Sequence, residues 1–439
     1  MYIEAFFLLL VLDLICPILS LKMTAASSSF PLKQVFSDTP AKQNVIHLNN
    51  AGAGLMTSSV LKSQVDYLND EATIGGYETV IKHREELDHV YQAVANLLNP
   101  VVVSPHEIAL FESATVGFSQ VFYSIPFEVG DKILCVEQEY ASNYLIYLHL
   151  RNEKGVEIEI LPTTSEGDVC LESLNRMLEE MDNVKVVSIC HIPTNSGLVN
   201  DVVGIGSMIR SSRRGNEIIY VVDACQSAGQ LCLDVARIKC DVLSATSRKY
   251  LRGPRGAGFA FIKKETMEKF NLHPPIIDLR GAKWVSKDIY NLDETAKRFE
   301  WWEFNYAAQV GMGVAIDYAL DIGIKNIEIR IRKLAEHLRN RLLETSEAVM
   351  LHSVGKLQCG IVTFHILGMD AKNVVRILRE KYKINVSVSG PTSTLLDSRR
   401  QETDLDLIRA SVHYYNDEEE IERFISAIDE IQNASDPIC

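Results

Sequence analysis

The sequence of 439 residues lacks long apolar runs beyond its extreme N-terminus, so we expect no membrane span in the mature domain. Positive charge is scarce: 44 Lys and Arg stand against 58 Asp and Glu, a net charge of -14. An acidic surface repels phosphate backbones, which disfavours nucleic acid as a partner. The nine cysteines include no Cys-x-x-Cys pair. We therefore expect no metal site, and this cysteine usage is typical of a reducing compartment.

The N-terminal segment 1–30 is hydrophobic, and we set it apart from the fold. Ala5–Leu12 and Leu14–Leu21 have the composition of a signal-peptide core. However, the chain opens with Met-Tyr-Ile-Glu, which carries no positive charge, and Asp13 interrupts the apolar run. Translation from Met23 would remove the segment altogether. Both explanations stay open, and we expect a cytoplasmic protein unless the segment directs secretory entry.

Short apolar runs alternate with longer amphipathic ones from Ile46 to about Lys264. Apolar strands joined by helices predict an α/β fold with a mainly parallel sheet covered on both faces. The last two strands are separated only by a Gly/Pro-rich turn, so we expect that pair to be antiparallel. The predicted strands are Glu107–Glu112, Lys132–Val136, Val156–Leu161, Val184–Ile189, Glu217–Val222, Asp241–Ala245 and Ala257–Ile262.

The pattern changes at Asp278–Phe299, a polar stretch with scattered aromatics that predicts a connector. A smaller α+β domain is expected beyond it. We thus predict a large domain over 46–295 and a small C-terminal domain over 305–435. The elements predicted in the small domain are a helical region (Asn305–Glu344), strands Gly360–Ile366, Ile384–Val388 and Leu407–Tyr414, and a closing helix (Asp417–Asn433).

Chemically useful groups follow four of the predicted strands. Ligands of open α/β sheets bind beyond the carboxyl ends of the parallel strands, so these groups should converge. They are Ser113-Ala114-Thr115 before a helix, Glu139-Tyr140, Asp223-Ala224-Cys225-Gln226, and Thr246-Ser247-Arg248-Lys249.

Pyridoxal 5′-phosphate (PLP) requires such a set. A lysine amine forms an imine with the aldehyde of PLP, and a carboxylate keeps its pyridine nitrogen protonated. A helix N-terminus with hydroxyl groups binds the phosphate, and a flat side chain stacks on the ring. Each feature alone is more often structural, since such residues commonly cap helices, form turns or lie on the surface. Their order and spacing together favour a PLP site.

Asp223-x-x-Gln226, followed by Thr246-x-x-Lys249 and Gly253-Pro254-x-Gly256-x-Gly258, resembles the class V aminotransferase family. The resemblance covers His47 to Asn433. It implies the type I fold of PLP-dependent transferases, with a seven-stranded sheet, and a homodimer acting on a small amino acid. It also implies that Lys249 carries PLP as a Schiff base. The cofactor-binding residues would be Ala114, Thr115, Tyr140, Thr194, Asn195, Asp223, Gln226, Thr246 and Arg248, and the substrate-binding residues Arg409 and Asn50.

Three positions depart from this family's pattern. Tyr140 stands where the family usually stacks a histidine on the ring, and Arg248 replaces the histidine that usually precedes the lysine. Glu303 stands where many members supply a threonine to the partner subunit's phosphate site. Since an ionised carboxylate cannot donate a hydrogen bond, Arg248 is expected to balance the phosphate charge instead.

The cofactor leaves the reaction open, because the protein decides which substrate bond breaks. Cysteine desulfurases of this family carry a catalytic cysteine in the loop that corresponds to Ser389–Asp397, and this loop has none. We therefore favour C–S β-lyase chemistry without a persulfide cysteine, since Gly75-Gly76-Tyr77 and Arg298-Phe299-Glu300 resemble the hercynylcysteine sulfoxide lyase group. The alternatives are an aminotransferase or epimerase, as in isopenicillin N epimerase-like proteins, a disfavoured cysteine desulfurase, and a non-catalytic homologue.

Overall fold

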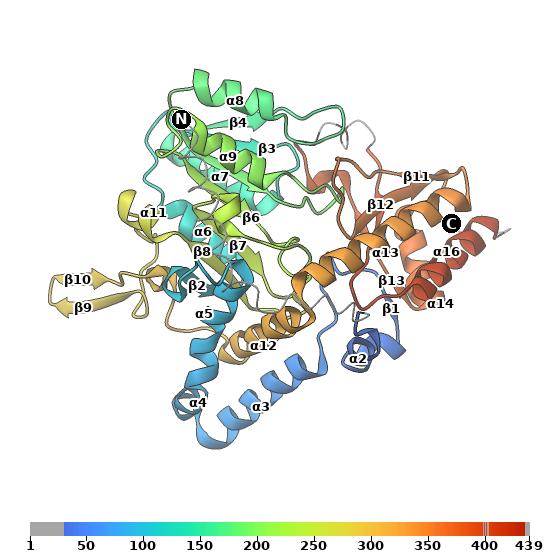
Figure 1. Ribbon diagram of the computed structural model, residues 1–439, viewed down its shortest axis with the longest axis horizontal. Helices are drawn as coiled ribbons and strands as arrows, with labels where there is room; N and C mark the ends of the chain where they lie inside the picture. The colour runs from blue at the N-terminus through green and yellow to red at the C-terminus, as the bar shows by residue number, and fades with distance from the viewer. Residues whose placement is uncertain (1–29, 398, 400, 402–403, 435–439) are drawn as a thin grey trace, which may run out of the picture.

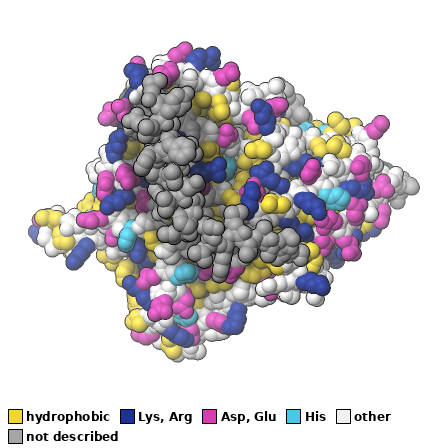
Figure 2. Space-filling view, in the orientation of Figure 1, with side chains coloured by type: hydrophobic (Ala, Val, Ile, Leu, Met, Phe, Trp, Pro, Cys, Tyr) yellow, Lys and Arg dark blue, Asp and Glu magenta, His cyan; other side chains and the backbone are white. Residues whose placement is uncertain are grey.

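The computed structural model describes residues 30–397, 399, 401 and 404–434. The segment 1–29, on which the expectations about a signal peptide and a second start codon depend, lies outside the described residues. Figure 1 shows a large sheet surrounded by helices and, beside it, a smaller sheet from the C-terminal part of the chain. Acidic and basic side chains are interspersed over the face seen in Figure 2.

The large sheet has seven strands in the order β2-β8-β7-β6-β5-β3-β4. Strand β8 pairs antiparallel with both β7 and β2, and the other neighbouring pairs are parallel. The predicted fold class and the antiparallel pair are thus confirmed. The strands are β2 (Ile108–Phe111), β3 (Lys132–Val136), β4 (Glu157–Leu161), β5 (Val184–Cys190), β6 (Ile219–Asp223), β7 (Val242–Thr246) and β8 (Gly258–Ile262).

Helices cover both faces of this sheet, because successive strand residues point to opposite faces and both sets are apolar. In β3, Leu134 belongs to the core cluster on one face and Cys135 to the cluster on the other. The Leu134 side packs against α5 (Arg84–Leu98), α8 (Leu171–Glu180), α9 (Val202–Ser211) and α10 (Val235–Ile238); the Cys135 side packs against α6 (Ala114–Ser124), α7 (Ala141–Lys154) and α11 (Lys264–Lys269).

The smaller sheet is antiparallel, with strand order β11-β12-β15-β14. A chain segment from near the N-terminus joins this part of the molecule, because β1 (Ile46–His47) pairs in parallel with β13 (Ile384–Asn385). The elements of this region are β11 (Val349–Leu351), β12 (Ile361–Ile366), β14 (Ser387–Ser389), β15 (Leu407–Ser411), α13 (Ile324–Thr345), α14 (Ala371–Tyr382) and α16 (Glu418–Asn433).

The helical region predicted over Asn305–Glu344 is two helices, α12 (Tyr306–Ile322) and α13. They meet at Gly323, whose φ of 88° lies in the region that favours glycine. Within the described part of the chain, no single helix is long and apolar enough to cross a membrane. The pair α12 and α13 passes that test of length and composition only together, across a bend of 79°.

The predicted connector differs from the structure. It contains a hairpin of β9 (Ala282–Ser286) and β10 (Ile289–Leu292), which projects from the molecule in Figure 1. The side chains of this hairpin are largely exposed. Since neither strand has a buried face, the sequence lacks the alternation of apolar and polar residues that predicts a strand. The remaining elements are α2 (Leu32–Ser37), α3 (Ser58–Ile74), α4 (Gly76–Lys82) and the 3₁₀ turns η1 (Pro40–Gln43), η2 (Pro105–Glu107), η3 (Ala296–Phe299) and η4 (Pro391–Ser393).

Arg252, three residues after Lys249, joins distant parts of the chain. Its side chain is almost fully buried. The guanidinium donates to the carbonyl of Leu55 at 2.7 Å, the hydroxyl of Thr39 at 2.6 Å and the hydroxyl of Tyr414 at 3.0 Å. The backbone N–H of Arg252 donates to the Lys249 carbonyl at 3.0 Å. The lysine turn is therefore tied both to the beginning of the chain and to the segment after β15.

Candidate active site

A cavity lies at the carboxyl ends of β6 and β7, beside the first turn of α6. This is the edge of the sheet at which open α/β folds bind their ligands. The cavity is lined by Ser113, Ala114, Thr115, Tyr140, Cys190, Ile192, Thr194, Asp223, Cys225, Gln226, Thr246, Arg248 and Lys249.

Lys249 supplies the amine of this cavity. The side chain follows β7 and is 8% exposed, and Nζ lies 5.9 Å from the centre of the Tyr140 ring. Burial lowers the pKa of Lys249, because the charged ammonium loses its hydration. A neutral amine, the form that attacks an aldehyde, is therefore more accessible here than on a surface lysine.

Asp223, the last residue of β6, supplies the carboxylate. Its Oδ1 accepts from the backbone N–H of Cys225 at 2.9 Å, and its Oδ2 accepts from the side-chain amide of Asn143 at 2.9 Å. One N–H group on each oxygen holds the carboxylate in a single orientation. Asp223 and Lys249 thus face the same cavity, as a PLP ring between them requires.

The first turn of α6 forms an anion site. Ser113 caps the helix by accepting from the backbone N–H of Val116 at 3.2 Å, and Ala114 and Thr115 begin it. The N–H groups and dipole of a helix start favour negative charge. Gly258 permits this arrangement, since a Cβ there would come within 2.8 Å of the Ala114 nitrogen. Arg248 adds a cation at the cavity wall, and burial lowers its pKa.

A polar chain connects Gln226 to Arg409. Gln226 Nε2 donates to the Ala51 carbonyl and to Thr194 Oγ1, both at 3.1 Å. Arg409 in β15 donates to the same Thr194 hydroxyl at 2.7 Å and to Ser387 Oγ at 3.1 Å. The Gln226 Oε1 atom is buried and has no hydrogen-bond partner among the described residues. An orphaned acceptor at a cavity wall indicates a site for a ligand hydroxyl.

The sequence-predicted site residues fall into two groups. Lys249 and eight predicted cofactor-binding residues line the cavity, and Arg409 adjoins it through Thr194. Asn195 and Asn50 lie outside the lining, which differs from the prediction. Asn195 Oδ1 accepts from Ser389 Oγ at 2.7 Å. The Asn50 amide donates to the Ser411 carbonyl at 2.7 Å, and its oxygen accepts from the Tyr415 hydroxyl, so its groups hold backbone segments together.

Sequence reasoning gave no role to several residues at the site. Cys225 lines the cavity because the Asp-x-x-Gln spacing encloses it. Glu139 and Asn143 lie behind Asp223, and their spacing of four residues at the start of α7 could have indicated a shared face.

The described donor set fits PLP. It offers a buried amine, a carboxylate with fixed orientation, a helix start with an adjacent cation, and an unpaired amide oxygen at one wall. Asp223 would pair with the pyridine nitrogen, and the α6 start with Arg248 would hold the phosphate.

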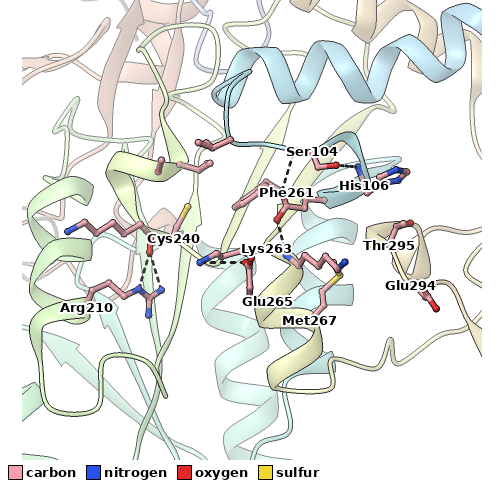
Figure 3. Close-up of a pocket in the computed structure, with 16 residues that line it drawn as sticks. Ser104, His106, Arg210, Cys240, Phe261, Lys263, Glu265, Met267, Glu294 and Thr295 are labelled. Carbon is pink, nitrogen blue, oxygen red and sulfur yellow. Dashed lines mark hydrogen bonds and ion pairs between the residues drawn. The ribbon is translucent and has the colours of Figure 1, made fainter. Parts of the chain in front are cut away.

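A second cavity, of about 770 Å³, lies at the opposite edge of the sheet (Figure 3). There the Arg210 guanidinium is paired with the Asp241 carboxylate, and Lys263 Nζ lies 3.6 Å from Glu265 Oε2. Asp241 directly precedes β7, so this is the amino-terminal edge of the parallel strands. This cavity does not combine a buried lysine with an oriented carboxylate, so we place the active site at the other edge.

The model of the family described as aminotransferase class-V matches residues 46–424. This chain belongs to the class-V aminotransferase family, as its motifs predicted, and is a PLP-dependent enzyme.

Two relatives and one solved structure are similar to this chain over nearly its whole length. Proteins from Pyrococcus abyssi and Methanothermobacter thermautotrophicus, each named a probable cysteine desulfurase, are both 28% identical to this chain; the alignments cover 91% of it and 97% and 98% of those proteins, respectively. The apo structure of a cysteine desulfurase from Thermococcus onnurineus NA1 has a TM-score of 0.82 and 26% identity, covering 92% of this chain and 99% of that one.

These relatives correct the predicted reaction. C–S β-lyase chemistry without a persulfide cysteine was favoured over desulfuration because the loop over 389–397 has no cysteine. That prediction is wrong: relatives aligned over nine-tenths of the chain are named cysteine desulfurases. Outside that loop, Cys190 and Cys225 are among the residues that line the cavity.

Borohydride reduction of the PLP-loaded enzyme should attach the cofactor to Lys249, because this amine faces the cavity from a buried position. Peptide mass spectrometry locates the modified lysine. Lys249→Ala should lose the visible absorption of bound PLP, whereas Lys263→Ala, at the second cavity, should keep it. Attachment to any other lysine would contradict the assignment.

Proposed function

We propose that this enzyme is a cysteine desulfurase, which transfers the sulfur of L-cysteine to an acceptor thiol, forming a persulfide, and leaves alanine. The observation that carries this proposal is the match over nearly the whole length of relatives with that name. A small cavity with a buried amine suits a small amino acid, and Arg409 beside it suits a carboxylate.

Each site residue has a proposed part in this reaction. Bound PLP supplies a ring that accepts electrons from the substrate's α-carbon. Asp223 keeps the pyridine nitrogen protonated, and Gln226 bonds the ring hydroxyl through its unpaired oxygen. Lys249 holds the cofactor and then moves a proton to and from the substrate carbon. Burial lowers the pKa of Lys249 and so favours its role as a base near neutral pH.

Arg409 is the proposed anchor of the substrate carboxylate. The guanidinium is held by Ser387 Oγ and by the Thr194 carbonyl and hydroxyl oxygens, so few side-chain rotamers remain to be lost on binding. A guanidinium can donate two parallel hydrogen bonds to a carboxylate. The link through Thr194 to Gln226 would set the distance between the carboxylate site and the ring.

We also propose that the chain forms a homodimer. Helices α3 and α4 expose apolar side chains that a partner would cover, namely Leu68, Tyr77 and Ile81, which are 53%, 74% and 75% exposed.

Purified enzyme given L-cysteine and a reducing thiol should release alanine and sulfide in equal amounts. Amino-acid analysis and a sulfide assay measure the two products, and Lys249→Ala is the inactive control. Pyruvate and ammonia in place of alanine would contradict the proposal, because they result from elimination rather than sulfur transfer.

Arg409→Ala should raise the KM for L-cysteine by about tenfold or more, since a hydrogen bond to a charged group contributes about 1.5–3 kcal/mol. The kcat should change less than KM. Arg376→Ala is a matched control, because Arg376 pairs with Glu380 on the exposed side of α14. An unchanged KM would remove Arg409 from the substrate site.

Light scattering of the wild-type protein as it elutes from a size-exclusion column should give a molecular mass twice that of one chain. Replacing Leu68 and Ile81 by Asp should lower the measured mass toward that of the monomer, because burying a charge in a dry interface is costly. Glu157→Lys, an exposed change on β4 away from these helices, should leave the mass unchanged. A monomeric wild-type enzyme would contradict the proposal.

A further inference from the structure

Two buried carboxyl groups lie on either side of one amide in the active site. Asn143 Nδ2 donates to Asp223 Oδ2 at 2.9 Å and to Glu139 Oε1 at 3.1 Å. Glu139 is 3% exposed and Asp223 is 6% exposed. Two buried negative charges bridged by a neutral amide would repel each other with little screening, so the arrangement favours one charge and one proton.

Donor and acceptor geometry indicates where that proton lies. Glu139 Oε1 already accepts two N–H groups, from the Tyr140 backbone at 2.8 Å and from Asn143. Glu139 Oε2 lies 3.3 Å from the Tyr147 hydroxyl, which also lies 2.8 Å from Ser188 Oγ. Tyr147 has a single hydroxyl proton, so it can donate to only one of the two. Ser188 has a hydroxyl proton of its own, so this chain fits either charge state of Glu139. Both oxygens of Asp223, however, already accept an N–H group, whereas Glu139 Oε2 faces only a hydroxyl, so the proton fits Glu139 better than Asp223.

The other titratable groups around Glu139 do not compete for the charge. Burial raises the pKa values of the Tyr147 phenol and of the Cys135 and Cys190 thiols, so all three stay neutral. Burial, together with the nearby charge of Asp223, raises the pKa of Glu139 to about 8. Glu139 is therefore the group that holds a proton at neutral pH.

We propose that Glu139 is a protonated positioning residue, which acts with Asn143 to keep the single negative charge of the two carboxyl groups on Asp223. Asn143 holds Asp223 Oδ2 through one hydrogen bond, and Glu139 holds Asn143 through another. The amide has two N–H groups and donates one to each carboxyl group. The charge then stays on the carboxylate that faces the cofactor ring. This inference rests on PLP binding and holds whichever amino acid the enzyme converts.

The affinity of the apoprotein for PLP at pH 7 tests the inference. Glu139→Gln, which is neutral and of similar shape, should bind PLP within about threefold of wild type. Asn143→Ala and Glu139→Ala should bind it about tenfold or more weakly, because Asp223 loses an oriented donor. Glu137→Gln, on the same loop but hydrogen-bonded to Thr163, is the matched control and should equal wild type.

The outcomes separate the possible roles. Glu139→Gln binding as weakly as Glu139→Ala would show that a charge at this position matters, and would overturn the inference. Unchanged affinity of Asn143→Ala would overturn it as well. Thermal unfolding of each apoprotein identifies a variant that fails to fold. If Glu139→Ala fails to fold, the PLP affinities of Glu139→Gln and Asn143→Ala relative to wild type still test the inference.

Infrared spectroscopy observes the proton directly. The difference spectrum of wild-type apoprotein minus Glu139→Gln at pH 7 should contain the band of a protonated carboxylic acid. The band should disappear as pH rises through about 8, since the group then ionises. Absence of the band at pH 7 would overturn the inference. Neither readout involves substrate, so a failed cysteine assay would leave this result unaffected, and the reverse also holds.

Discussion

The contact between Asp223 and its two N–H donors is the constraint on which the active site depends. A buried carboxylate is costly unless hydrogen bonds replace its hydration. The backbone turn after β6 supplies one donor, and α7, through Asn143, supplies the other. Because α7 covers one face of the large sheet, the orientation of this carboxylate is set by the packing of the whole layer. The carboxylate charge needed for PLP chemistry is thus held by the turn after β6 and by α7 together.

Sequence reasoning predicted the layers well, because the strands are buried on both faces and therefore apolar throughout. The strand predicted over Lys132–Val136 coincides with β3. The hairpin of β9 and β10 escaped prediction since its exposed faces carry no alternating pattern. The break at Gly323 was also missed, because α12, which is apolar nearly all round, and α13, which is amphipathic, are both helical, and the backbone conformation of the glycine divides them.

For the site, motif spacing brought together Lys249, Asp223 and Gln226, since each lies at or within three residues of the carboxyl end of a parallel strand. Asn195 and Asn50 could not be resolved in this way. Both are polar residues in turns, and whether such an amide faces a cavity or a backbone carbonyl depends on segments far away in sequence, such as Ser389 and Ser411. The reaction was predicted wrongly because it was inferred from the absence of a cysteine in the single loop 389–397. The relatives align with nearly the whole chain.

The pairing of β1 with β13 has a consequence for synthesis. His47 and Asn385 are 338 residues apart, yet their strands lie side by side, and Arg252 ties both ends to the lysine turn. A ribosome extending the chain by about 5–20 residues per second would need on the order of half a minute to deliver β13 after β1. Until then the early segment has no strand to pair with. The order of translation therefore completes the residues that line the cavity, Ser113 to Lys249, well before the strand that holds the early segment in place.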